Sequence, residues 1–387
     1  MPAQAPQPAS TGLRPARVPE LDGLRAFAIL PVIFCHCYPR DGFFGWVGFV
    51  GAGGWMGVDL FFVLSGYLIT GILLRTVDDP HYYRNFIVRR ALRIFPLYYV
   101  CLALFTAAAW LGGGQQWSDM QKWGLGWFVV YLGNVRTALH GFPPVFSFIP
   151  LWSLQIEEQF YVLYPLVVLL LSRQNLRRFL VGCVVTAPLL RVFLVLFVTG
   201  SSGARYVLMP CRMDALALGG LVAILARCEP ARWPSRAQVR SAALIAGFAA
   251  LAVYAFAWRS QPAESPFHPL TSSLGYSLNG IAFASLLAIV VLSPSPVLAA
   301  VLRWRPFTYT GEIAYGLYLL HGPAAWMGRK LVMATIGVEV APHSAAAVPI
   351  TFLASYLAAG LSWRYFESPV LALKDRFTSP ARRLKGN

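Results

Sequence analysis

Charged residues are scarce in this sequence. Only 12% of its 387 residues are Asp, Glu, Lys or Arg, whereas 57% are hydrophobic and the mean hydropathy is +0.58. Soluble globular proteins carry roughly twice that share of charge. The composition therefore excludes a soluble globular chain and indicates an integral membrane protein.

Acidic residues are especially few, because 16 Asp and Glu stand against 32 Lys and Arg and leave a net charge of +16. Such an excess is also typical of proteins that bind nucleic acid. Here, however, the basic residues form short clusters between apolar runs, which is the pattern of cytoplasmic loops in membrane proteins. The sequence therefore predicts a lipid bilayer as a partner, and no nucleic acid.

Cysteine is scarce too. The six cysteines are scattered, and most fall inside apolar runs, so neither a disulfide framework nor a paired zinc motif is predicted. Cys35, His36 and Cys37 are metal-ligand types, but consecutive helical residues point about 100° apart and cannot close on one ion. No metal is predicted. No small-residue cleavage site follows Tyr38, so we do not expect a signal peptide.

Long apolar runs are what the sequence has in abundance, and ten of them are candidate membrane helices. They lie at 20–38, 56–74, 94–111, 152–171, 178–198, 209–226, 241–258, 274–292, 310–328 and 346–363. A shorter run at 123–135 is ambiguous. If it does not cross the membrane, every Arg and Lys cluster falls on one side, as the positive-inside rule requires.

We therefore predict an all-α integral membrane protein with about ten transmembrane helices and both termini in the cytoplasm. Segment 112–150 is expected to be external, with a re-entrant or interfacial helix. Residues 1–19, rich in Pro and Ala, are expected to be a disordered cytoplasmic tail. Residues 20–369 form one transmembrane domain, and residues 370–387 a basic cytoplasmic tail. No internal repeat and no soluble domain is predicted.

The first run, ELDGLRAFAILPVIFCHCY, holds Arg25 and His36 eleven residues apart. On a helix that separation is about 1100°, within ~20° of three turns, so both side chains share one face with a rise of ~16 Å between them. Ionisable side chains inside a membrane helix usually face a polar interior. Alternatively, Arg25 snorkels to the headgroups and His36 lies at the opposite interface.

The second run, GGWMGVDLFFVLSGYLIT, begins near the carboxylate of Asp59 and carries Ser65 and Gly66 at its middle. Asp59 and Ser65 are candidate lining residues of a polar interior, because such groups are unusual on a lipid-facing helix. The alternative is that Ser65 and Gly66 only permit close helix packing.

Three arginines lie close together in YYRNFIVRRALRIFPLYY. Arg89 and Arg93 are four residues apart and Arg90 and Arg93 three apart, so their guanidinium groups project from one short helix before Pro96. Arginine binds phosphate in a bidentate manner, and three together suit a polyphosphate head group. The alternative is contact with anionic lipid, or simple marking of topology.

The segment LWSLQIEEQFYVLYP carries a polar stripe formed by Ser153, Glu157, Tyr161 and Tyr164. These residues share one helix face and enter an apolar span, where a carboxylate is rare and usually functional. Glu157 and Glu158 could also merely favour the helix dipole at the start of the helix.

A histidine lies near mid-membrane in TYTGEIAYGLYLLHGP, where Tyr315, Tyr318 and His321 step by three along one face. A hydrogen-bonded core histidine is the commoner case, and we favour this structural role. Arg212 and Asp214, at the start of another run, form either a simple ion pair or part of an external mouth.

Together these motifs resemble the acyltransferase 3 family of membrane-bound bacterial O-acyltransferases, which act on surface polysaccharides, nodulation factors and some macrolides. In order, they are the R-x10-H spacing of Arg25 and His36, GVDLFFVLSGYLI, RRALRIFP, LWSLQIEEQFY and YGLYLLH. The resemblance extends from about Glu20 to Pro369. It implies ten membrane helices, acyl-CoA (commonly acetyl-CoA) as a cytoplasmic co-substrate, and an acceptor hydroxyl often presented externally. It also implies that the following residues matter for activity: Arg25, His36, Arg90, Arg93 and Glu157.

The expected function is transfer of an acyl group, expected to be acetyl, from acyl-CoA to a hydroxyl of a glycan. That glycan would be a cell-surface polysaccharide or its lipid-linked precursor at the bacterial cytoplasmic (inner) membrane. The phosphates of acyl-CoA would bind Arg89, Arg90 and Arg93, with Arg25 at the channel entrance. His36 would act as general base or briefly carry the acyl group, with Glu157 orienting its imidazole. Further expected site-lining residues are Asp59, Ser65, Glu158, Tyr161 and His321.

The resemblance leaves the last step of the transfer open. Some family members carry a C-terminal extracytoplasmic hydrolase-like domain, whereas this sequence ends soon after Pro369. We therefore expect that the chain finishes the reaction itself or hands the acyl group to a separate extracytoplasmic transferase. Two alternatives remain: acylation of a small molecule such as a macrolide sugar, and non-enzymatic transport of a glycan or lipid. A transporter would more typically show two related halves with broken helices, and none is visible.

Overall fold

All regular structure in the described part of the chain is helical, which confirms the predicted all-α fold. The computed structural model describes residues 18–39, 45–227, 234–260, 266–292 and 295–377. The predicted tails therefore lie largely outside the described residues. The first helix begins within the predicted N-terminal tail, at Pro19, and short helices continue to Phe377.

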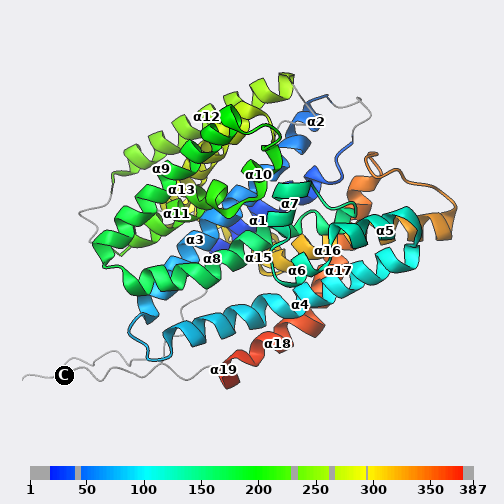
Figure 1. Cartoon of the computed structure of the whole chain (residues 1–387), viewed down its shortest axis with the longest axis horizontal. Coiled ribbons are helices and arrows are strands. Elements are labelled where there is room, and N and C mark those ends of the chain that lie inside the picture. Colours follow the sequence, from blue (N-terminus) through cyan, green and yellow to red (C-terminus); the bar gives the residue numbers. More distant parts are fainter. Residues whose placement is uncertain (1–17, 40–44, 228–233, 261–265, 293–294, 378–387) are drawn as a thin grey trace, which may run out of the picture.

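The helices follow one another through short connections, and Figure 1 shows α4 along one edge of the bundle, α12 along the opposite edge, and α1, α3 and α8 between them. In order they are α1 (Pro19–Cys35), α2 (Gly45–Ala52), η1 (Gly53–Met56), α3 (Gly57–Thr76), α4 (Tyr82–Gly112), α5 (Gly114–Trp123), α6 (Gly126–Val129), α7 (Gly133–His140), η2 (Phe146–Phe148), α8 (Leu151–Leu170), α9 (Arg173–Phe197), α10 (Ser202–Val207), α11 (Met209–Leu225), α12 (Arg236–Ser260), η5 (Thr271–Gly275), α13 (Tyr276–Leu292), α14 (Pro296–Leu302), α15 (Arg305–Glu312), α16 (Ala314–Ile336), α17 (Ala347–Ser362), η6 (Trp363–Glu367), α18 (Ser368–Ala372) and α19 (Lys374–Phe377).

Six helical stretches in the described residues are long and apolar enough to cross a membrane, so the predicted count of about ten is not confirmed. They are Trp46–Thr76, Tyr82–Gly112, Arg173–Phe197, Ser202–Leu225, Ala237–Ala257 and Thr271–Leu292. The other four predicted spans correspond to α1, α8, α16 and α17. With 17 residues, α1 is short for a crossing that needs about 20. The 16 residues of α17 continue directly into η6, where Arg364 and Glu367 interrupt the apolar character. Polar and charged side chains interrupt the apolar character of α8 and α16.

The ambiguous run 123–135 does not form one membrane-crossing helix. It contains α6, with 4 residues, and only the first three residues of α7, which has 8. Two tyrosines of α4 fix this region, because Tyr98 donates to the carbonyl oxygen of Phe128 at 2.8 Å and Tyr99 to that of Val129 at 2.9 Å. The segment is therefore built from short helices packed on α4, as expected of a non-spanning segment.

Small residues let α3 and α11 approach closely. A Cβ atom at Gly66 would overlap the backbone carbonyl of Leu216, and one at Gly219 would overlap that of Val63. Close approach of membrane helices at glycine is a common packing mode. The packing role considered for Gly66 is therefore confirmed, and it fixes the position of Ser65 beside it.

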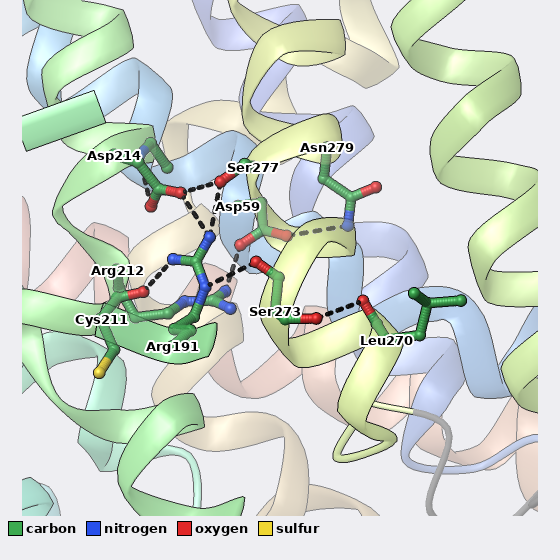
Figure 2. A network of polar contacts seen from close by, with 10 residues as sticks. Asp59, Arg191, Cys211, Arg212, Asp214, Leu270, Ser273, Ser277 and Asn279 are labelled. Atoms are coloured by element: carbon green, nitrogen blue, oxygen red, sulfur yellow. Dashed lines mark hydrogen bonds and ion pairs between the residues drawn. The ribbon is translucent and has the colours of Figure 1, made fainter. Parts of the chain in front are cut away.

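Two buried arginines join α3, α9, α11 and α13 (Figure 2). Arg212 forms an ion pair with Asp59, whose second carboxylate oxygen accepts a hydrogen bond from Asn279 Nδ2 at 3.0 Å. Arg191 forms an ion pair with Asp214 at 2.9 Å. None of these four charged side chains is more than 2% exposed. Paired burial of this kind fixes the mutual positions of the helices that carry the charges.

This network corrects two predictions. Arg212 does not pair with Asp214, because residues two apart on a helix point about 200° apart and meet different neighbours. Asp59, predicted to line the site, instead lies inside the network and lines neither of the pockets described below.

We expect Asp59→Leu to lower the free energy of unfolding by about 3–5 kcal/mol, because it leaves the Arg212 guanidinium buried without its carboxylate. Adding Arg212→Met should restore most of that loss, since apolar residues of similar size can replace a buried ion pair at little cost. Denaturant unfolding of detergent-purified protein measures both variants. Asp119→Leu is the control, because its pair with Lys122 is solvent-exposed and should contribute less than about 1 kcal/mol. Equal or greater loss in the double variant would contradict the interpretation.

Candidate active site

A pocket of about 110 Å³ lies between α1, α3, α4, α8 and α16. Three guanidinium groups line it, and we call it the arginine pocket. Its polar lining residues are Arg25, Ser65, Arg90, Arg93, Ser153, Glu157, Tyr161, Tyr315 and Tyr318. Five helices that are distant in sequence thus bring polar side chains to one place, as expected of a binding site.

The two arginines from α4 lack an ion-pair partner in the described part of the chain. Arg90 lies over the rings of Phe86 and Tyr161, at 5.7 and 5.9 Å from the ring centroids. Its Nε is buried and has no hydrogen-bond partner among the described residues. Arg93 is exposed, at the edge of the same pocket. Guanidinium groups placed in this way can bind an anion that enters the pocket.

Arg89 does not line this pocket, although the sequence predicts it together with Arg90 and Arg93. The reason is helical rotation. Adjacent residues point about 100° apart, so Arg89 points to another side of α4 than Arg90 does, away from the pocket lining. Arg25, predicted at the channel entrance, does line the pocket, and its Nη1 donates to Asp22 at 2.5 Å.

Glu157 lies inside the arginine pocket. Ser65 Oγ donates to its Oε1 at 2.5 Å, and the Tyr161 hydroxyl donates to its Oε2 at 3.2 Å. The predicted stripe of Ser153, Glu157 and Tyr161 therefore faces one cavity, and Ser65 faces it from α3. Tyr164 continues the stripe beyond the pocket and pairs with Thr70 at 2.9 Å.

Glu158 lies on another side of α8, because it is rotated by about 100° from Glu157. It is buried and does not line the arginine pocket, although the sequence predicts it as a lining residue. Its Oε1 has no hydrogen-bond partner in the described part of the chain.

The arginine pocket keeps a positive charge. Three guanidinium groups line it, Glu157 is the one carboxylate among its lining residues, and Asp22 pairs with Arg25 beside the pocket. Within this set, three positive charges against two negative ones leave a surplus of one. In a site enclosed by apolar helices such a surplus favours an anionic ligand.

A second pocket, of about 350 Å³, lies at the other end of α1. Aromatic side chains make up much of its wall, and we call it the aromatic pocket. Its lining residues are Val32, Cys35, His36, Tyr38, Ala52, Trp55, Val58, Phe142, Ile149, Pro150, Trp152, Tyr206, Pro266, Phe267 and Tyr318. Val58 and Tyr318 line both pockets, so the two cavities adjoin there. The Tyr318 hydroxyl is held by the carbonyl oxygen of Pro150 at 2.8 Å.

His36 and His321 form a pair at the aromatic pocket. His36 follows the last residue of α1, and its Nδ1 lies 3.2 Å from His321 Nε2. His321 is 1% exposed, and its Nδ1 lies 2.8 Å from the carbonyl oxygen of Tyr318 and 3.2 Å from that of Leu317. The structure thus shows the core hydrogen bonds expected for a structural His321, and in addition a contact with His36.

The hydrogen bonds assign the tautomers of the neutral pair. Carbonyl oxygens only accept, so His321 Nδ1 carries a proton and its Nε2 is an acceptor. His36 Nδ1 then donates to His321 Nε2. As a consequence, Nε2 of His36 carries no proton and has the protonation state of a general base.

Glu157 is predicted to orient the imidazole of His36, but its side chain lies in the other pocket. Its hydrogen bonds go to Ser65 and Tyr161 in the arginine pocket, whereas His36 lines the aromatic pocket. In this structure Nδ1 of the His36 ring lies 3.2 Å from Nε2 of His321, so His321 holds this side of the ring.

Sequence reasoning misses the walls of the aromatic pocket, because they come from short segments with no periodic pattern, such as the segment of Phe142 and that of Phe267. It also misses Arg191. A signal for Arg191 exists, since it is a single cation inside the apolar run of α9. No group of three His, Cys, Asp or Glu side chains placed to hold a metal occurs among the described residues.

Comparison with known proteins identifies relatives. The model of the family described as "Acyltransferase domain" matches residues 18–360. The protein YrhL of Bacillus subtilis is 29% identical over 95% of this chain and 56% of its own length. The O-acetyltransferase OatA of Staphylococcus aureus is 29% identical over 92% of this chain and 57% of its own length.

The peptidoglycan O-acetyltransferase OatA of Listeria monocytogenes is 27% identical over 91% of this chain and 56% of its own length. The chain thus spans a little more than half the length of these curated relatives. No solved structure matches it significantly.

Proposed function

This chain belongs to the acyltransferase 3 family, and we propose that it is a membrane O-acyltransferase that moves an acetyl group from acetyl-CoA to a hydroxyl of a glycan. The observation that carries this proposal is the junction of two unlike cavities at Val58 and Tyr318. One is positively charged and suits an anionic donor. The other contains an imidazole in the protonation state of a base and suits a hydroxyl acceptor.

The donor would enter the arginine pocket. Its volume of about 110 Å³ is small for a whole coenzyme, since ligand pockets usually measure roughly 300–1,000 Å³, so only the thioester arm would enter. Arg93 is exposed at the edge and would meet the phosphates outside, while half-buried Arg90 would meet the part nearer the arm. Because basic clusters mark the cytoplasmic side, we place this opening toward the cytoplasm of a bacterial inner membrane.

The acceptor hydroxyl would lie beside His36. Nε2 of His36 takes the hydroxyl proton while the oxygen attacks the thioester carbonyl carbon, the C–S bond breaks, and the CoA thiolate leaves and takes up the proton. In a second route, Nε2 first attacks the carbonyl carbon, the C–S bond breaks and the CoA thiolate leaves. The acceptor oxygen then attacks the acetyl carbon, the bond from Nε2 to that carbon breaks, and the hydroxyl proton passes to the thiolate. In both routes the bond from His36 Nδ1 to His321 Nε2 holds the ring in the reactive orientation.

The acceptor we propose is a cell-surface polysaccharide or its lipid-linked precursor. All three of these relatives are named as O-acetyltransferases, and two of the names refer to peptidoglycan. Mass spectrometry of envelope glycans and secreted metabolites from cells with and without the protein tests the function. The expected result is a mass gain of one acetyl group on a glycan. A gain only on a secreted small molecule would assign a different acceptor, and no gain anywhere would contradict the proposal.

A further prediction concerns the donor. We expect the double variant Arg90→Ala with Arg93→Ala to raise the donor KM at least tenfold, because each lost charge-assisted contact is worth roughly 1.5–3 kcal/mol and about 1.4 kcal/mol is a factor of ten. Steady-state kinetics on purified protein with varied acetyl-CoA measures it. Arg89→Ala is the matched control, since this neighbouring arginine lies outside the pocket and should leave the KM unchanged. An equal rise in the control would mean that only the overall charge of α4 matters.

A further inference from the structure

The walls of the aromatic pocket are a connected set of ring faces. Trp152 and Tyr206 lie 4.6 Å apart between ring centroids, Tyr206 and Phe267 5.0 Å, and Phe267 and Phe142 5.8 Å. Trp55 completes the wall from η1. The rings come from η1, α8, α10 and two connecting segments, so the tertiary fold assembles them.

Charge is absent from this wall. None of the described residues that line the aromatic pocket is Asp, Glu, Lys or Arg, in contrast with the arginine pocket next to it. The guanidinium group of Arg212 lies over two of these rings. It is 5.5 Å from the ring centroid of Tyr206 and 5.8 Å from that of Trp152. Arg212 is itself neutralised by Asp59. A charged ligand would therefore lose its hydration without gaining an ion-pair partner from this wall.

One buried polar group of the wall, the indole N–H of Trp55, has no hydrogen-bond partner among the described residues. Trp55 is only 6% exposed. A buried donor without an acceptor is costly, and it marks a place where a ligand oxygen would be favourable.

We propose that the aromatic pocket is the acceptor subsite and holds one uncharged sugar ring. The apolar C–H face of the ring would pack on Trp152, Tyr206 and Phe267, and a ring or hydroxyl oxygen would accept from Trp55 Nε1. Another hydroxyl would then lie at Nε2 of His36, beside the junction with the arginine pocket. This inference rests on the proposed function, because it assigns the acceptor of that reaction to this cavity.

A purely apolar occupant fits the pocket less well. An acyl chain would cover the rings but would leave the Trp55 indole N–H buried and unsatisfied. A sugar satisfies both features, since it has an apolar face and a rim of hydroxyl groups. The volume of about 350 Å³ lies at the lower end of the usual range of roughly 300–1,000 Å³ for small-molecule sites.

Saturation-transfer NMR on the detergent-purified full chain tests this assignment without any donor present. The probes are three neutral disaccharides (N,N′-diacetylchitobiose, cellobiose and a rhamnose disaccharide) and one charged disaccharide that contains glucuronate. We expect at least one neutral disaccharide to bind, with transfer to its ring protons, and the charged one to bind at least tenfold more weakly. Binding of none of the neutral probes, or equal binding of the charged one, would overturn the proposal.

Variants locate the binding. Trp55→Phe keeps an aromatic ring and removes the N–H, so the dissociation constant of the neutral sugar should rise roughly fivefold to tenfold. Phe267→Ala, at a partly exposed position, should weaken binding as well. Phe248→Ala, at an exposed position on α12, is the control that should bind as the wild type does. Unchanged affinity in Trp55→Phe and Phe267→Ala would overturn the assignment.

The binding result and the reaction can fail separately. If the sugar binds in this pocket but acetyl-CoA yields no acetylated product with any acceptor, the proposed function fails and the subsite stands. If acetyl transfer occurs while the pocket variants keep the wild-type sugar affinity, the function stands and the subsite lies elsewhere.

Discussion

In His36→Ala we expect acetyl transfer to fall by roughly 10²-fold to 10⁴-fold, which is the usual contribution of a general base. The physical reason is that the ring nitrogen Nε2, unprotonated in the hydrogen-bonded pair with His321, is lost. The donor KM should stay close to the wild-type value, because the arginine pocket is a separate cavity. Turnover of acetyl-CoA by purified protein measures both quantities.

The control for this variant is His140→Ala, which removes an exposed histidine at the end of α7. It should leave the rate unchanged. If monodisperse His36→Ala transfers acetyl groups at more than about a tenth of the wild-type rate, the loss is too small for a general base and the assignment is wrong. Added imidazole provides a second readout, because it should restore part of the rate if only the missing base limits the reaction.

The arginine pocket shows how far helical periodicity predicts a site. Ser153, Glu157 and Tyr161 follow one another at spacings of four, and all three line the same cavity. The same periodicity separates Arg89 from Arg90, so the prediction that groups all three arginines of the loop is only partly supported by the geometry. Rotation about a helix axis is readable from the sequence wherever the helix is regular.

Contacts between helices are not readable in this way. His36 and His321 are 285 residues apart, and Arg212 and Asp59 are 153 apart. Periodicity tells which face of a helix is polar but not which neighbouring face it meets. Glu157 is predicted beside His36 because both are polar residues at similar predicted depth, whereas the packing of α8 on α3 directs it to Ser65.

The number of membrane crossings depends on the same polar residues. Glu157 lies on α8, His321 lies on α16, and His36 directly follows α1. None of these three helices is among the six stretches that are long and apolar enough to cross. A polar site inside a membrane helix shortens the apolar stretch of that helix, because each ionisable side chain takes the place of an apolar one. A count based on apolar runs alone is therefore weakest at the helices that matter most for function.

The orientation of His36 gives the second prediction of large effect. His321→Leu removes the acceptor for the proton on His36 Nδ1, so the ring can rotate or take the other tautomer, which places a proton on Nε2. Loss of the correct tautomer is as damaging as loss of a base, and we expect the rate to fall roughly 10²-fold or more. The donor KM should change little, since His321 does not line the arginine pocket.

The matched variant His321→Gln separates positioning from packing. The glutamine amide oxygen can accept the hydrogen bond from His36 Nδ1, so His321→Gln should retain a rate at least tenfold above that of His321→Leu. If His321 served only to fill the core, leucine would be tolerated as well as glutamine or better, because burying an amide without partners is costly. Steady-state kcat values of the two purified variants, compared at equal thermal stability, decide between these roles. Equal kcat values for the two variants would mean that the contact between the histidines does not orient the base.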